Sequence, residues 1–369
     1  MWLREQISGV DVQIDENAIV SRGEGAIYRL IGNHSFIAKI YHKPSAERTE
    51  KVQELLAMRP CRKLGQHRDV AWPSDILLDP SGVAVGHTMP WLGDAKPLSV
   101  LLNAHSRIDE FPTVTFKNLV SVAANLATLV DEIHATKRIV LCDFNADNVL
   151  VKNNSSLVSL IDLDGAQITA ADGTIYPCRV ITDDYGAPEQ RNVNLADIEQ
   201  LPSADLFGLA VMLHQLMLAC SPYDGKWMGS GLPPHMGQRI ESNLLARPYC
   251  DSAPRFRFWK RSQDYIVEPH YAVPTDLLSD MINSLLGRSF WDGHEKPEVR
   301  PTAREWADAL NQFRSNLIQC PSRPQHWYGN SLKFCPWCRL KKEKNADYFP
   351  TPARSQQPSN PTPRRTRYV

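Results

Sequence analysis

Residues 140–151 read VLCDFNADNVLV, a loop rich in acidic and amide side chains between two apolar runs. Asp143 and Asn148 lie five residues apart in it, and an apolar strand follows directly. A carboxylate on such a loop can orient a hydroxyl group and accept its proton. An amide oxygen at the second position can ligate Mg²⁺. The stretch therefore predicts a site that holds a reacting hydroxyl beside a magnesium ion.

A second acidic stretch follows at residues 160–165, which read LIDLDG. It brings Asp162 and Asp164 to the end of a predicted β strand. A carboxylate in this position is well placed to hold Mg²⁺ that bridges nucleotide phosphates. We expect Asp162 to be the magnesium ligand and Asp164 to lie close enough to assist. Which of the two is the main ligand stays open.

Two features of the N-terminal region also suit a nucleotide. Gly23 and Gly25 lie between apolar runs, where glycines let backbone N–H groups approach phosphates, although an ordinary hairpin has the same pattern. Lys39 lies inside an apolar strand, and a buried ammonium group needs a partner. The candidate partners are Glu50 and Glu54, one turn apart on a helix predicted over residues 46–58.

With these motifs in this order, about residues 18–315 resemble the protein kinase superfamily. Later residues extend the resemblance: Ala187-Pro188-Glu189, Asp205 at the start of a long helix, and Arg300. The resemblance implies an α+β fold of two lobes, a β-rich one over residues 1–92 and a helical one over residues 93–318. It implies that ATP binds between the lobes, that Asp205 holds the backbone of the Asp143 loop, and that Arg300 pairs with Glu189.

The same resemblance assigns roles to single residues. Lys39 would hold the α and β phosphates of ATP, and its separation from Glu54 favours that glutamate over Glu50. Asp143 would be the catalytic carboxylate, with Asn148 and Asp162 as magnesium ligands. The adenine-binding hinge would comprise Met89, the Pro90 carbonyl and the Leu92 N–H group.

The glycine-containing turn and the Asp143 loop depart from the usual kinase pattern. Tyr28 replaces the third glycine, Asn145 replaces a lysine near the γ-phosphate, and Leu141-Cys142 stands where His-Arg is usual. Cys142 cannot pair with a phosphate as an arginine does. We therefore expect no activating phosphate, and replacement of Thr174 and Thr182 by alanine should change turnover by less than about tenfold, or 1.4 kcal/mol.

A separate motif begins after the predicted kinase-like region. It contains Cys320, His326, Cys335 and Cys338, which are enough ligands for a structural zinc ion in a ribbon over residues 319–340. A redox role for Cys335 and Cys338, or no metal at all, are the alternatives. The combination resembles bacterial kinases with a zinc-ribbon-like segment. Such kinases imply a PP2C-type phosphatase and a von Willebrand factor A-type protein as partners.

The overall composition narrows the remaining choices. The 369 residues carry 41 basic and 41 acidic side chains, which argues against bulk binding to nucleic acid or to anionic membranes. No apolar run is long enough to cross a bilayer, so we expect a cytoplasmic protein. Residues 341–369 are basic and proline-containing, and we expect them to be disordered.

The sequence thus favours a kinase that phosphorylates Ser or Thr hydroxyls of a protein. We expect its own chain to be among the targets. Two alternatives remain: a pseudokinase scaffold that binds nucleotide without turnover, and a small-molecule kinase of the aminoglycoside phosphotransferase type. The substrate and the oligomeric state stay open.

Overall fold

The computed structural model describes residues 1–58, 68–93, 95–152, 155–246 and 266–352. Its N-terminal strands form a closed barrel of six antiparallel strands in the order β1-β2-β3-β4-β7-β6. The strands are β1 (Trp2–Glu5), β2 (Asp11–Arg22), β3 (Gly25–Leu30), β4 (Asn33–Tyr41), β6 (Asp75–Leu78) and β7 (Ala84–Pro90). Alternating apolar side chains, among them Leu3, Ile14 and Leu77, fill the interior. Lys39 lies on β4 of this barrel.

One helix, α1 (Ala46–Met58), covers the barrel and has the bounds expected from the sequence. It buries Val52 and Leu55, and Val52 packs with Tyr41 and Ile76 of the barrel. Because a helix turns once in 3.6 residues, this apolar stripe fixes which side chains point inward. Lys51 shares the buried face, whereas Glu50 is exposed.

Two small sheets carry the polar loops. One has the order β5-β11-β10-β8, from β5 (Arg68–Val70), β8 (Ala95–Pro97), β10 (Val149–Lys152) and β11 (Val158–Leu160); the other has the order β13-β12-β9, from β9 (Ile139–Val140), β12 (Gln167–Thr169) and β13 (Ile175–Tyr176). Since β10 and β11 pair as a hairpin, Asn148 before β10 and Asp162 after β11 emerge at the same end. The β5–β11 pair also links residues on both sides of the boundary expected at residue 92.

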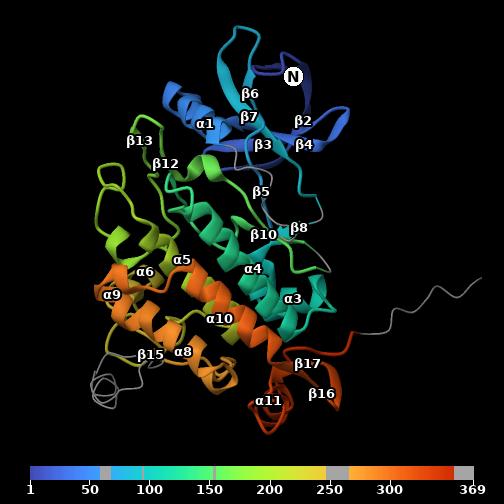
Figure 1. Ribbon diagram of the computed structural model, residues 1–369, viewed down its shortest axis with the longest axis vertical. Helices are drawn as coiled ribbons and strands as arrows, with labels where there is room; N and C mark the ends of the chain where they lie inside the picture. Colours follow the sequence, from blue (N-terminus) through green and yellow to red (C-terminus); the bar gives the residue numbers. More distant parts are fainter. Residues whose placement is uncertain (59–67, 94, 153–154, 247–265, 353–369) are drawn as a thin grey trace, which may run out of the picture.

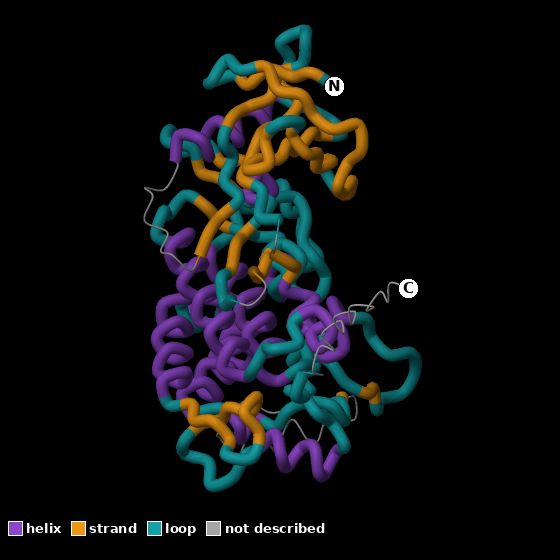
Figure 2. The backbone as a smooth tube through the Cα atoms, turned by 90° about the vertical axis from the view of Figure 1, so that its right-hand side faces the viewer, coloured by secondary structure: helices purple, strands orange, loops and turns teal. Residues whose placement is uncertain are grey.

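The rest of the chain is mainly helical. The long helices are α4 (Phe116–His134), α5 (Pro202–Leu218) and α10 (Ala303–Ser315). The shorter ones are α2 (Leu98–Leu102), α3 (Ala104–Glu110), α6 (Met236–Glu241), α8 (Asp280–Gly287), α9 (Gly293–Glu295) and α11 (Pro336–Lys344). The barrel lies at one end of the molecule and these helices at the other (Figures 1 and 2), an arrangement of α+β type.

The C-terminal segment corrects two expectations. The sequence over residues 306–318 predicts a helix to the end of that range, but α10 ends at Ser315 and the hairpin of β16 (Leu317–Cys320) and β17 (Arg323–Gly329) follows. Disorder from residue 341 is also wrong as far as residue 352, because Phe349 is buried and its ring centroid lies 4.8 Å from that of Trp337. Large aromatic side chains gain enough from burial to hold this segment against α4. Residues 353–369 of the predicted tail lie outside the described residues.

Candidate active site

The loop after β9 is fixed by a buried carboxylate. Asp205, in the first turn of α5, is 1 % exposed and accepts hydrogen bonds from the backbone N–H groups of Leu141 (2.8 Å) and Cys142 (2.7 Å). Cys142 has a φ of 61°, a left-handed conformation that a side chain tolerates only when the surroundings impose it. These bonds hold the loop as the resemblance implies, and they orient Asp143 directly after it.

The Asp143 carboxylate meets a hydroxyl group from a distant segment. The Thr182 hydroxyl donates to Asp143 Oδ1 at 2.7 Å and also accepts from the Asn145 amide at 3.0 Å. Asn148 donates to the Asp143 backbone carbonyl at 3.0 Å. The sequence showed Thr182 only as one hydroxyl among several in its segment. The structure therefore adds Thr182 to the candidate site.

This contact revises one expectation from the sequence. Loss of a hydrogen bond to a charged group costs about 1.5–3 kcal/mol. We now expect Thr182→Ala to lower turnover by roughly tenfold or more. Thr182→Ser should restore most of it, and Thr174→Ala, at an exposed position, should stay within about twofold. The measurement is initial phosphoryl-transfer rate per folded protein, and equal rates for Thr182→Ala and Thr174→Ala would contradict the role of this contact.

Lys39 is drawn to the second acidic stretch. The ammonium group is buried and contacts Asp162, and it donates to Asp164 Oδ1 at 2.9 Å. Burial opposes the charge on Lys39, but the two carboxylates raise the pKa of the ammonium above its ordinary value. Burial likewise opposes the charge on Asp164, and Lys39 nevertheless holds the pKa of that carboxyl below its ordinary range. The strand end at residues 160–165 and the barrel therefore meet at Lys39.

The expected pairing of Lys39 with Glu54 is not found. Glu54 accepts from Arg138 Nη2 at 2.6 Å, and Glu50 accepts from the Tyr176 hydroxyl at 3.3 Å. The reason is the phase of α1, whose buried stripe contains Lys51 rather than either glutamate. The structure thus leaves Glu54 outside the group around Lys39.

The glycine-containing turn joins β2 to β3. Gly23 has a φ of 53°, which suits a residue without a side chain. A Cβ atom on Gly25 would lie 2.6 Å from the Ile40 carbonyl oxygen, so Gly25 is required by the close approach of β4. Between the two, Glu24 forms a two-bond pair with Arg48 of α1 at 2.8 Å. The structure explains both glycines by backbone geometry, and a role toward phosphates stays a prediction.

An apolar cluster occupies the expected position of the hinge. Met89, near the end of β7, is buried with Ile37 and Ala71, and Leu92 packs against this cluster. Pro90 is the last residue of β7. An apolar cluster of this kind suits a flat heteroaromatic ring. The hydrogen bonds that the Pro90 carbonyl would accept from an adenine, and that the Leu92 N–H group would donate to it, stay predictions.

A buried ion pair fixes the segment that follows Thr182. The side chain of Arg300 is 0 % exposed and donates to both carboxylate oxygens of Glu189, at 2.6 and 2.8 Å. Such bidentate pairs define geometry as well as energy. The pairing implied by the kinase resemblance is therefore present.

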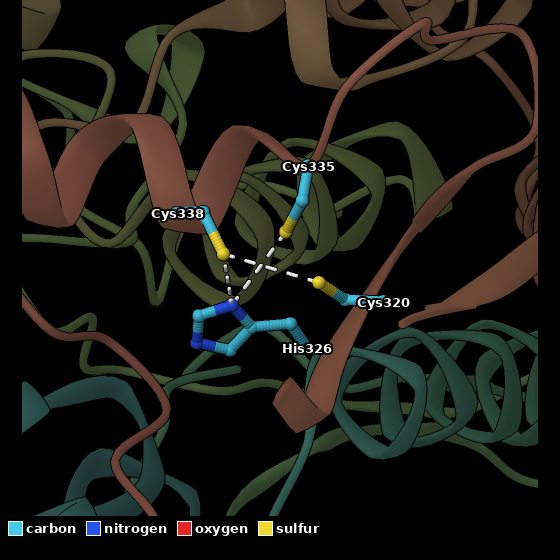
Figure 3. A group of neighbouring side chains, drawn as sticks. All are labelled: Cys320, His326, Cys335 and Cys338. Atoms are coloured by element: carbon cyan, nitrogen blue, oxygen red, sulfur yellow. Dashed lines mark hydrogen bonds between the residues drawn. The ribbon is translucent and has the colours of Figure 1, made fainter. Parts of the chain in front are cut away.

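The four predicted metal ligands lie together at the C-terminal hairpin (Figure 3). Their ligand atoms are all within 4.8 Å of one another, and the Sγ atoms of Cys320 and Cys338 are 3.9 Å apart. Two sulfurs on a tetrahedral zinc ion would be about 3.8 Å apart. His326 points Nδ1 at the sulfurs of Cys335 and Cys338, each at 3.5 Å. Three thiols and one imidazole in this arrangement fit a structural zinc ion.

The far side of the imidazole supports the same interpretation. His326 Nε2 lies 3.8 Å from Asp347 Oδ1, and among the described residues neither atom has a hydrogen-bonding partner. Histidines that ligate a metal through one nitrogen usually donate from the other to a carboxylate. Asp347 is placed for that role, although it lies beyond the ribbon boundary expected at residue 340.

Comparisons with known proteins agree with the geometry of the site. No protein-family model matches the chain. Protein kinase YegI of Escherichia coli O157:H7 and that of Escherichia coli strain K12 are each 27 % identical over 326 residues. The match covers 87 % of this chain and 48 % of each relative, so the chain spans about half their length. This similarity supports a protein-kinase-like family.

Across the ranges that the structure describes, no helix combines the length and the apolar character that a membrane crossing needs.

Proposed function

We propose that this protein is an ATP- and Mg²⁺-dependent protein kinase that transfers the γ-phosphoryl group to Ser or Thr hydroxyls of a protein. One observation carries the proposal: Lys39 of the barrel meets Asp162, whose strand end lies beside the Asp143–Asn148 loop. This would bring together a cation for the phosphates, two oxygen ligands for magnesium and a carboxylate base. The similarity to curated protein kinases supports it.

The residues divide the work as follows. The cluster around Met89 would bind the adenine ring between a barrel lobe, residues 1–92, and a helical lobe, residues 93–318. Asp162, with a side chain 42 % exposed, and Asn148 would hold Mg²⁺, which supplies charge neutralisation at the phosphates. Asp143 accepts a hydrogen bond from a hydroxyl group already, and in the reaction it would orient the acceptor hydroxyl. Catalysis would come mainly from positioning and electrostatics.

The choice of a protein hydroxyl over a small-molecule acceptor rests on the segment from Thr182 to Glu189. Thr182 reaches Asp143 with an aliphatic hydroxyl, so the approach to this carboxylate admits a threonine side chain. The buried Arg300–Glu189 pair stabilises the neighbouring segment as a platform. A PP2C-type phosphatase and a von Willebrand factor A-type protein remain proposed partners from the resemblance alone.

Nucleotide binding tests the proposal at its base. ATP with Mg²⁺ should raise the melting temperature of the protein, and ATP with excess chelator should raise it less, because binding to the native state alone stabilises it. Lys39→Met should weaken the affinity for ATP by roughly tenfold or more, or 1.4 kcal/mol. Asp172→Asn, an equally conservative change at an exposed turn, should not. The absence of any ATP-dependent shift in the wild type would refute the proposal.

A further inference from the structure

Asp164 is fully engaged by buried donors. Its Oδ1 accepts from Lys39 Nζ at 2.9 Å and its Oδ2 accepts from the Tyr41 hydroxyl at 2.9 Å. Tyr41 and His87 hydrogen-bond to each other at 3.2 Å, and all four side chains are buried. Mg²⁺ keeps several waters when it binds to proteins, so it favours carboxylates with open oxygens. Asp162, with its partly exposed side chain, is open in this sense and Asp164 is not.

The helix beside Asp164 turns a lysine inward where the sequence predicts a glutamate. α1 lies against the turn η1 (Leu163–Gly165) and turns Lys51 inward, and Lys51 is 7 % exposed. Its Nζ reaches the Pro177 carbonyl at 3.5 Å. Glu54 meanwhile pairs with Arg138. Of the two buried cations, Lys39 of β4 therefore contacts Asp164, and Lys51 of α1 contacts the Pro177 carbonyl.

We propose that Asp164 is the positioning residue that anchors Lys39 for the nucleotide phosphates, in place of a carboxylate on α1. Asp162 is then left for Mg²⁺, and the Tyr41 hydroxyl holds Asp164 in place. The inference rests on the proposed function for the identity of the ligand, and the Lys39–Asp164 pair itself rests on the geometry alone.

The arrangement has a mechanical consequence. Lys39 and the magnesium ligand Asp162 are tied to a single turn of three residues, because Asp164 follows Asp162 by two positions. A displacement of α1 would move Lys51 and Glu54 without taking away the partner of Lys39. Phosphate binding would then depend on the turn and the barrel rather than on the position of the helix.

A double-mutant cycle on stability tests the pair without any assay of activity. Lys39→Met leaves buried Asp164 with only the Tyr41 hydroxyl, and Asp164→Asn leaves Lys39 with only Asp162, whose side chain is partly exposed. The double variant should therefore lose less melting temperature than the sum of the two. The effects of Lys39→Met and Glu54→Gln should add. If Asp164→Asn does not fold alone, folding of the Lys39→Met/Asp164→Asn protein shows the same coupling. Additive effects for Lys39 and Asp164, or no recovery in the double variant, would overturn the anchor.

Kinetics separate the roles of the two aspartates. Asp164→Asn should raise the KM for ATP by about tenfold or more while the Mg²⁺ concentration for half-maximal rate stays unchanged. Asp162→Asn should instead raise the Mg²⁺ requirement, and Asp172→Asn should change neither. A raised Mg²⁺ requirement in Asp164→Asn would contradict the assignment. If the wild type binds no ATP although the stability coupling is found, the proposed function and the role toward phosphates fail, and only the ion pair stands.

Discussion

Asp143→Asn is expected to lower the rate of phosphoryl transfer by at least about a hundredfold, because a positioned carboxylate contributes roughly 10²- to 10⁴-fold as a general base. The affinity for ATP should stay nearly unchanged, since Lys39, Asn148 and Asp162 are untouched. Asparagine keeps the shape of the side chain and can still accept the Thr182 hydrogen bond. A loss of rate would therefore report the missing carboxylate rather than a collapsed loop.

The matched control lies in the same loop. Asp147 is exposed and accepts a hydrogen bond from Ser99, so Asp147→Asn makes the same chemical change away from the proposed reacting hydroxyl. We expect it to keep most of the activity. Both variants are compared by initial rate at saturating ATP and by ATP affinity. Full activity in Asp143→Asn would remove Asp143 from the mechanism.

Removal of the metal ligands should have the second large effect. Wild-type protein should contain about one zinc ion per chain, and the Cys335→Ser/Cys338→Ser variant should contain none. Structural zinc supplies about 10–16 kcal/mol of apparent binding energy in small peptides, so its loss should unfold the hairpin and α11. Trp337 packs on Phe116 of α4 with ring centroids 4.9 Å apart, and the melting temperature of the whole protein should fall as well.

The zinc experiment has a simple control. Cys220 is a buried cysteine outside the cluster, so Cys220→Ala should retain the metal. Metal content by mass spectrometry, on protein purified without chelator, is the decisive quantity. A wild-type protein with no zinc would show that the four side chains gather without a metal.

The residues that could be predicted from the sequence share one property: they are polar groups in apolar surroundings. Lys39 within a strand and Asp162 at a strand end have few reasons to be there except a partner, and the structure joins them. The cluster of four metal ligands could also be predicted from the sequence, because the Cys-x2-Cys spacing of Cys335 and Cys338 lets both thiols bind one metal ion. In each case the local sequence pattern alone limits the roles that these side chains can have.

Other features depend on contacts between distant segments. The phase of α1 is set by Val52, which packs on the barrel, and by Leu55, which packs in the core of the helical region. That packing turns Lys51 inward and takes Glu54 to Arg138. The contact of Thr182 with Asp143 joins residues 39 positions apart, and no local pattern marks it.

The C-terminal boundary was misjudged for a different reason. Basic and proline-containing composition predicted disorder from residue 341, but Tyr348 and Phe349 are buried in the helical core. Two aromatic side chains outweigh the surrounding polar residues because each buries a large apolar area.

The most direct test of kinase activity measures the transfer of a labelled γ-phosphate from ATP to protein. Purified protein is incubated with Mg²⁺ and ATP labelled at the γ-phosphate, together with a generic protein acceptor, and the labelled amino acids are identified after acid hydrolysis. The account predicts label on phosphoserine or phosphothreonine that requires Mg²⁺ and is absent with Asp143→Asn. Nucleotide binding without any transferred label would contradict it and would identify a pseudokinase scaffold instead.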